Sequence, residues 1–189
     1  MKKKIIIIGA CVILAIIIIA SVIGAYNGLV DNREEVKNAA SQISTVLQRR
    51  ADLIPNMVKT VKAYSDYESQ TYIDVTKARN TVKNADSVED LSEASGELNR
   101  AIDVWVNAVS ENYPELKADT QYTALMDELA GSENRVAVAR KDYNDAAKKY
   151  NSKIKKFPPN IVAGLFDFDD ADYFESDSSA NSVPEVSFD

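Results

Sequence analysis

The sequence predicts an all-α membrane protein: an N-terminal transmembrane helix followed by an antiparallel up-and-down four-helix bundle of long helices. Three observations lead to this fold class. Residues 5–25 contain no charged side chain. Four later stretches repeat apolar residues three and four positions apart, which places them on one face of a helix. Glycine and proline are scarce, with six and five in 189 residues, which disfavours a β-sandwich and its frequent turns.

The membrane anchor is expected at Ile5 to Ala25, directly after three lysines at positions 2–4. As a helix this stretch would be about 31 Å long, close to the thickness of the hydrocarbon core of a bilayer. Two runs of four isoleucines, at 5–8 and 16–19, make it apolar on every face, whereas a soluble helix buries one stripe. We therefore expect a single span whose partner is the lipid bilayer.

Three other interpretations of the N-terminus fit less well. A cleaved signal peptide has a shorter apolar region, about 7–15 residues, and the cleavage match at Val22-Ile23-Gly24 is weak. A lipoprotein signal would use Cys11, but the apolar run continues well past it, so Cys11 is interpreted as a lipid-facing residue. A soluble protein with an unusually apolar first helix would not need so many isoleucines.

Orientation follows from the basic residues near the span, because acidic residues contribute little. Three lysines precede the span, and Arg33 and Lys37 follow it. This balance favours an N-terminus in the cytoplasm and a bundle outside it.

Composition excludes several chemistries. The chain has no histidine, and its one cysteine lies in the span, so neither a histidine-based triad nor a zinc site with nitrogen or sulfur ligands can form. No glycine-rich phosphate loop is present. We predict no catalytic residue, no cofactor and no metal, and therefore no enzyme.

The net charge of −7 is concentrated at the C-terminus. Eight acidic residues and no basic ones lie in 167–189, which leaves the rest of the chain nearly neutral. Nucleic-acid binding requires a basic face, and none is visible, so no nucleic acid is expected as a partner.

The first bundle helix is predicted to continue from Tyr26 to about Arg50. Pro55 would be costly inside a helix but is tolerated in a first turn. We therefore place a break at about Arg50–Asp52, with Asp52 as N-cap of a second helix that turns back. A single helix kinked at Pro55 is the alternative. The first stripe comprises Leu29, Val36, Ala40, Ile43 and Leu47.

The second helix has a stripe with one charged member, Glu68. A carboxylate on this face either lies at a frayed or hydrated part of the bundle or pairs with an arginine from another helix, such as Arg79, Arg135 or Arg140. We favour this structural role over catalysis, because a lone carboxylate lacks a partner acid or base. The stripe comprises Ile54, Met57, Val61, Tyr64, Glu68, Thr71, Val75, Ala78, Val82 and Ala85.

The third and fourth helices have clear start signals. Ser87-Val88-Glu89-Asp90 resembles a capping box, and Asp119 is a candidate N-cap for a helix that reaches Lys156. Trp105 is expected in the core. The two stripes are Leu91, Ala94, Leu98, Ile102, Trp105 and Val109, then Tyr122, Leu125, Leu129, Ser132, Val136, Ala139, Tyr143, Ala147, Tyr150, Ile154 and Phe157.

Four parts of the chain are thus expected: the basic start and anchor (1–25), the bundle (26–157), a capping segment (158–175) and an acidic, disordered tail (176–189). An up-and-down topology returns the capping segment to the bilayer. Its phenylalanines, at 166, 168 and 174, are expected to pack on the bundle, because the neighbouring aspartates would be repelled by anionic headgroups.

Several stretches together resemble the LemA family of bacterial membrane proteins. They include Arg33-Glu34-Glu35-Val36-Lys37-Asn38-Ala39, Leu47 to Asn56, Tyr113 to Ala118, Glu133 to Arg140, and the Tyr-Asn pairs at 143 and 150. The resemblance covers Tyr26 to Phe174. It implies a single N-terminal anchor and a long-helix bundle at the bacterial cell membrane, and it brings no established enzymatic reaction.

The leading functional hypothesis is a non-enzymatic interaction or scaffolding module that binds another envelope protein. Its candidate contact or structural polar residues are Arg49, Arg50, Glu68, Arg79, Asn134 and Arg135. The alternatives are self-assembly into a homo-oligomer that organises the membrane, and binding of a small ligand between the helices.

Overall fold

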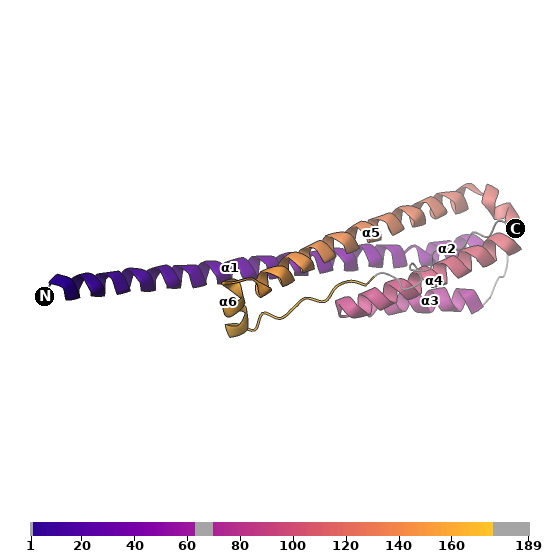
Figure 1. Cartoon of the computed structure of the whole chain (residues 1–189). Helices are drawn as coiled ribbons and strands as arrows, with labels where there is room; N and C mark the ends of the chain where they lie inside the picture. The colour runs from indigo at the N-terminus through magenta and orange to yellow at the C-terminus, as the bar shows by residue number, and fades with distance from the viewer. Residues whose placement is uncertain (1, 63–69, 176–189) are drawn as a thin grey trace, which may run out of the picture. The chain divides into compact units, whose positions relative to one another are not determined.

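The computed structural model describes residues 2–62 and 70–175, and every regular element in these residues is helical (Figure 1). The predicted all-α class is therefore confirmed. The chain divides into two compact units. We call Met1–Ala39 with Asn144–Ala171 the anchor unit, and Ala40–Tyr143 with Asp172–Asp189 the bundle unit. Glu68 and the acidic tail predicted at 176–189 lie outside the described residues.

The anchor unit contains most of helix α1 (Lys2–Ala51). In the described residues, one helix is long and apolar enough to cross a membrane, and it starts at Lys2, near the N-terminus. The isoleucines between Ile6 and Ile23 are exposed, with 69% at Ile6 and 55% at Ile23. Such exposure suits a helix surrounded by lipid. The C-terminal turns of α5 and the short helix α6 (Pro159–Leu165) complete this unit.

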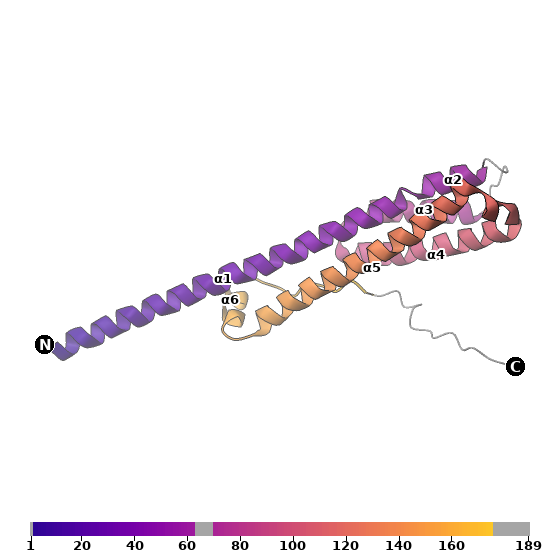
Figure 2. The same ribbon diagram turned by 90° about the horizontal axis from the view of Figure 1, so that it is seen from above.

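The bundle unit contains the end of α1, then α2 (Ile54–Lys62), α3 (Gln70–Lys83), α4 (Val88–Asn112), the 3-10 turn η1 (Pro114–Ala118) and most of α5 (Thr120–Lys155). Helices α3 and α4 pack along each other as an antiparallel pair. Figure 2 shows α2 extending the end of α1 in the same direction, and hydrogen bonds from Asn99 to Glu133 and from Arg140 to Ser95 join α5 to α4.

Pro55 does not mark the turn that the sequence predicted. The chain leaves helical geometry only at Asp52 and Leu53, and α2 then continues onward, as in the alternative of a kinked helix (Figure 2). Pro55 is the second residue of α2, where the missing N–H costs little. The apolar stripe runs unbroken through this point, since Leu47, Ala51 and Ile54 are all buried.

Asp52 is not an N-cap but an ion-pair partner. Its carboxylate lies 2.7 Å from Lys83 Nζ and 3.8 Å from the guanidinium of Arg79, both on α3. These contacts join the α1–α2 junction to α3.

Helix α4 follows its prediction closely. Ser87 Oγ accepts a hydrogen bond from the Asp90 N–H, and the Asp90 carboxylate accepts one from the Ser87 N–H, which completes the capping box. All six residues of its predicted stripe are buried, Trp105 at 1% exposure. The helix ends at Asn112, just before Pro114.

Helix α5 begins as predicted but ends sooner. Asp119 Oδ1 accepts hydrogen bonds from the N–H groups of Gln121 and Tyr122, as an N-cap does. The helix ends at Lys155, and Phe157, predicted on the buried stripe, is 79% exposed. Because the helix stops before Phe157, the periodicity no longer fixes where that side chain points.

The segment after α6 is extended and packs through alternate aromatic residues. In the anchor unit Phe168 is buried, and in the bundle unit Phe174 is buried. In contrast, three apolar side chains nearby are exposed: Phe166 (51%), and Ile161 (55%) and Leu165 (71%) of α6.

Candidate functional site

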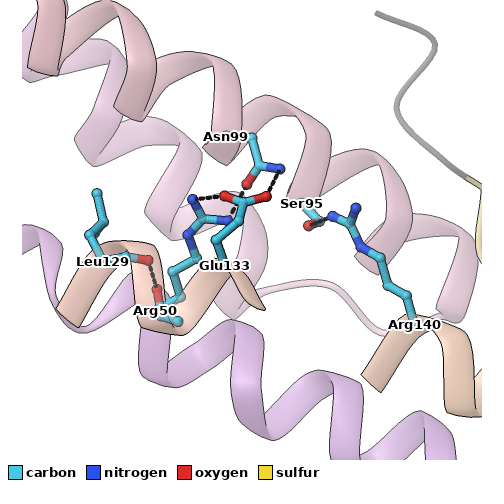
Figure 3. Close-up of polar contacts among 7 residues, drawn as sticks. Arg50, Ser95, Asn99, Leu129, Glu133 and Arg140 are labelled. Carbon is cyan, nitrogen blue, oxygen red and sulfur yellow. Dashed lines mark hydrogen bonds and ion pairs between the residues drawn. The ribbon is translucent and has the colours of Figure 1, made fainter. Parts of the chain in front are cut away.

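Three helices of the bundle unit bring polar side chains together around Arg50 (Figure 3). Arg50, on the last turn of α1, is only 2% exposed. Its guanidinium pairs with the carboxylate of Glu133 on α5 and donates a hydrogen bond to Asn99 Oδ1 on α4. Asn99 also donates to Glu133 Oε1 at 3.5 Å. We call Arg50, Asn99 and Glu133 the polar triangle.

A second carboxylate, Asp103, lies one helical turn after Asn99 on α4. Partial burial raises the pKa of Asp103 above its usual value, the negative charge of Glu133 raises it further, and Arg50 lowers it. The carboxylates of Asp103 and Glu133 thus both interact electrostatically with the guanidinium of Arg50. The cluster holds two acidic side chains and one basic side chain.

The polar triangle borders a surface groove of about 530 Å³ between α4 and α5. Asn107 and Asn134 contribute exposed amides to its lining, and Met126 and Leu129 contribute apolar surface. The lining of the groove therefore combines carboxylate and amide groups with apolar side chains.

A separate contact links α5 to α4 further along the bundle unit (Figure 3). Arg140 donates to the hydroxyl of the buried Ser95, and its guanidinium lies 5.0 Å from the centre of the Phe174 ring. The Tyr143 hydroxyl donates to the Asp172 carbonyl at 2.7 Å. Burial, and then the charge of Asp172, raise the pKa of Tyr143. These contacts hold the extended segment against the helices.

The anchor unit has its own polar contacts just beyond the apolar span. Lys153 Nζ donates to the Gly28 carbonyl at 2.6 Å, which joins the end of α5 to α1. Asn151 exchanges two hydrogen bonds of 2.8 Å with the backbone of Ala171. The guanidinium of Arg33 lies 4.7 Å from the centre of the Phe168 ring.

The candidate residues from the sequence fall in different places. Arg50 and Asn134 line the groove. Arg49 is exposed, and the exposed Arg135 pairs with Glu128 at 2.5 Å. Arg79 faces Asp52, whereas Glu68, its proposed partner, lies outside the described residues.

Sequence reasoning missed Asn99, Asp103 and Glu133. The only available signal was the four-residue spacing of Asn99 and Asp103, which places both on one side of a helix. Spacing on one helix does not reveal which residues of another helix lie opposite.

The side chains of this cluster are suited to binding a charged or polar partner. Guanidinium, carboxylate and amide groups form directional hydrogen bonds to charged and polar partners. Among residues 2–62 and 70–175, no group of three or more histidine, cysteine, aspartate or glutamate side chains is placed to hold a metal ion.

Comparison with known proteins identifies a matching family and several relatives. The model of the LemA family matches residues 39–188. Protein LemA of Metamycoplasma hominis is 30% identical over 157 residues, which cover 82% of this chain and 70% of that protein. Magnetosome protein MamQ 2 of Paramagnetospirillum magneticum is 27% identical, with 83% of this chain and 67% of that protein covered. Magnetosome protein MamQ of Magnetospirillum gryphiswaldense is 24% identical, with coverages of 82% and 66%.

Proposed function

Because the chain belongs to the LemA family, we propose that it is a non-enzymatic, membrane-anchored helical module that binds another protein of the bacterial envelope. The anchor, Ile5 to Ala25, holds the chain in the cell membrane with its N-terminus in the cytoplasm. The bundle unit supplies the binding surface. The partner is a protein segment that presents a lysine or arginine to the groove between α4 and α5.

The observation that carries this proposal is the charge of the groove. Asp103 and Glu133 supply two carboxylates against the single guanidinium of Arg50. Glu133 is 48% exposed, so one of its edges remains open to a partner. A cationic side chain would relieve the repulsion between the carboxylates, and the amides of Asn107 and Asn134 would add hydrogen bonds.

A surface groove of this kind suits a polypeptide better than a small ligand. A small-molecule site is typically a cleft that buries most of its ligand. Here the exposed side chains of Asp103, Asn107 and Asn134 form part of the lining, while Leu98 and Trp105 of α4 are fully buried away from it.

Site-specific photocrosslinking in intact cells tests the proposal. A photoreactive residue at Asn134 should form a discrete adduct with one partner, and the reversal of charge in Asp103→Lys should abolish it. The matched control carries the photoreactive residue at Val138, one turn further along α5, which is 59% exposed and does not line the groove.

Three outcomes would contradict the proposal. An adduct of twice the chain mass of 20.8 kDa would identify a second copy and favour self-assembly. An adduct that survives Asp103→Lys would place the contact outside the groove. Equal labelling from Asn134 and Val138 would indicate collision without recognition.

A further inference from the structure

The anchor unit exposes an apolar surface next to the end of its membrane span. We define the α6 face as Phe157, Ile161, Leu165 and Phe166, with exposures of 79, 55, 71 and 51%. Ile161 and Leu165 are four residues apart on α6, Phe166 follows Leu165, and Phe157 lies between α5 and α6. On the other side of α6, Val162 and Ala163 are buried at 3 and 5% exposure. The helix therefore packs on the protein through one side and leaves its larger side chains uncovered.

The level of this face along α1 is fixed by aromatic contacts. The Phe166 ring lies 5.0 Å from the Tyr26 ring, centre to centre, in an edge-to-face arrangement, and Phe168 lies 5.6 Å from the same ring. Tyr26 is the first residue after the span, so a bilayer that fits Ile5 to Ala25 places it at the lipid–water boundary. Tyrosine is enriched at that level in membrane proteins.

The direction of α6 also fits this boundary. Within the anchor unit α6 lies crosswise to α1, upright in Figure 1 and foreshortened in Figure 2. A helix that runs crosswise to a membrane span lies along the membrane surface. Helices that lie along this surface bury an apolar side in the outer part of the lipid layer.

From these contacts we infer that the α6 face inserts into the surface of the bilayer that α1 crosses, as a second membrane attachment besides the span. The occupant of the face is lipid. This inference is independent of the protein partner proposed for the groove, because α6 belongs to the anchor unit and the groove to the bundle unit.

The charges near α6 indicate whether attachment of the α6 face requires anionic lipids. The helix has no charged residue. Lys155 before it pairs with Asp170 after it at 2.8 Å, so one aspartate of the segment is neutralised. Attachment should therefore depend on burial of apolar surface and persist without anionic lipids. This conclusion replaces the expectation that repulsion keeps the whole segment off the membrane.

Depth-dependent fluorescence quenching in the full chain tests the inference. Cys11→Ser removes the native thiol, and Ile161→Cys or Leu165→Cys carries a polarity-sensitive fluorophore. Both sites are exposed, so labelling leaves the core intact. The matched control is Lys148→Cys, an exposed position on α5 in the same unit. Each variant is reconstituted into phosphatidylcholine vesicles with or without bromine near the carboxyl end of the acyl chains.

In brominated vesicles the fluorophore at 161 or 165 should lose most of its emission, and its spectrum should be shifted to shorter wavelengths. The emission of the fluorophore at 148 should be unchanged by brominated lipid and should be quenched by aqueous iodide. Iodide quenching at 161 and 165 equal to that at 148 would overturn the inference. Protection at 161 and 165 from both quenchers would also overturn it, because another protein surface, such as a second copy, would then cover the face.

Discussion

At the scale of single residues, the buried guanidinium of Arg50 determines how the polar triangle contributes to stability. Arg50 is almost fully buried, whereas half of the Glu133 side chain remains in water. Loss of a partner is most harmful when it leaves a charge buried and unpaired, and less so when the remaining charge can be hydrated. The two members of the pair should therefore respond unequally to substitution.

Glu133→Ala should lower the free energy of unfolding by about 2 kcal/mol, because it removes the ion-pair partner of the buried Arg50 guanidinium, which then keeps its hydrogen bond to the neutral Asn99. Arg50→Met, which keeps most of the buried volume, should lower it by less. Denaturant titrations followed by the fluorescence of Trp105, the sole tryptophan, measure both effects. Arg135→Ala breaks the exposed pair with Glu128 and serves as control, with an expected change below about 0.5 kcal/mol. A larger loss from Arg50→Met than from Glu133→Ala would show that hydrogen bonding to Asn99 dominates.

Asp103 should make stability depend on pH in a defined direction. Its pKa is raised in the folded protein, first by burial and then by Glu133, so folding disfavours the ionised form. The resulting penalty is absent below the ordinary aspartate pKa of about 3.9 and appears as the pH rises through the ordinary and then the folded value. Asp103→Asn should therefore raise the unfolding midpoint at pH 7 and leave it unchanged at acidic pH. An equal stabilisation at both pH values would exclude titration of Asp103 as the cause.

At the scale of elements, the helices depend on caps and stripes that the chain specifies locally. The α3–α4 connection is an example, since the Ser87–Asp90 capping box starts α4 within a few residues of the end of α3. Hydrogen bonding to Ser87 lowers the pKa of Asp90, so the box contributes most when this carboxylate is ionised.

Ser87→Ala should destabilise the bundle unit by about 1 kcal/mol, the usual effect of losing an N-cap side chain. Ser87→Thr should retain most of the stability, because its hydroxyl can also accept the Asp90 N–H and donate to the Asp90 carboxylate. Thermal unfolding followed by Trp105 fluorescence compares the two variants. Equal destabilisation by both would show that packing of the serine, and not its cap, matters.

For the molecule as a whole, the proposed orientation in the membrane depends on the basic residues on either side of the apolar span. Three lysines precede it, and Arg33 and Lys37 follow it at short distance. Such a small difference should be easy to reverse, since orientation follows the excess of basic residues on the cytoplasmic side.

Replacement of the lysines at 2–4 by glutamine should convert a uniform orientation into a mixed or inverted one. A cysteine at Ser176, in a Cys11→Ser background, reports the side on which the C-terminal part lies. In intact cells a membrane-impermeant maleimide should label it in the parent chain and label it less after the lysine substitutions. Absence of labelling in the parent, with labelling after permeabilisation, would place the bundle in the cytoplasm.

The long apolar N-terminal helix, the helical class, the capping box of α4 and nearly all of the buried stripes could be predicted from the sequence alone. These features depend on contacts within a few residues of each other, so periodicity and cap residues suffice to predict them. Three features could be seen only in the folded chain. Helix α2 extends α1 beyond Pro55. Arg50 contacts Asn99 and Glu133, and apolar side chains of Phe157 and α6 remain exposed. Those outcomes depend on the rotation and register of each helix against its neighbours, which a repeat along one helix does not encode.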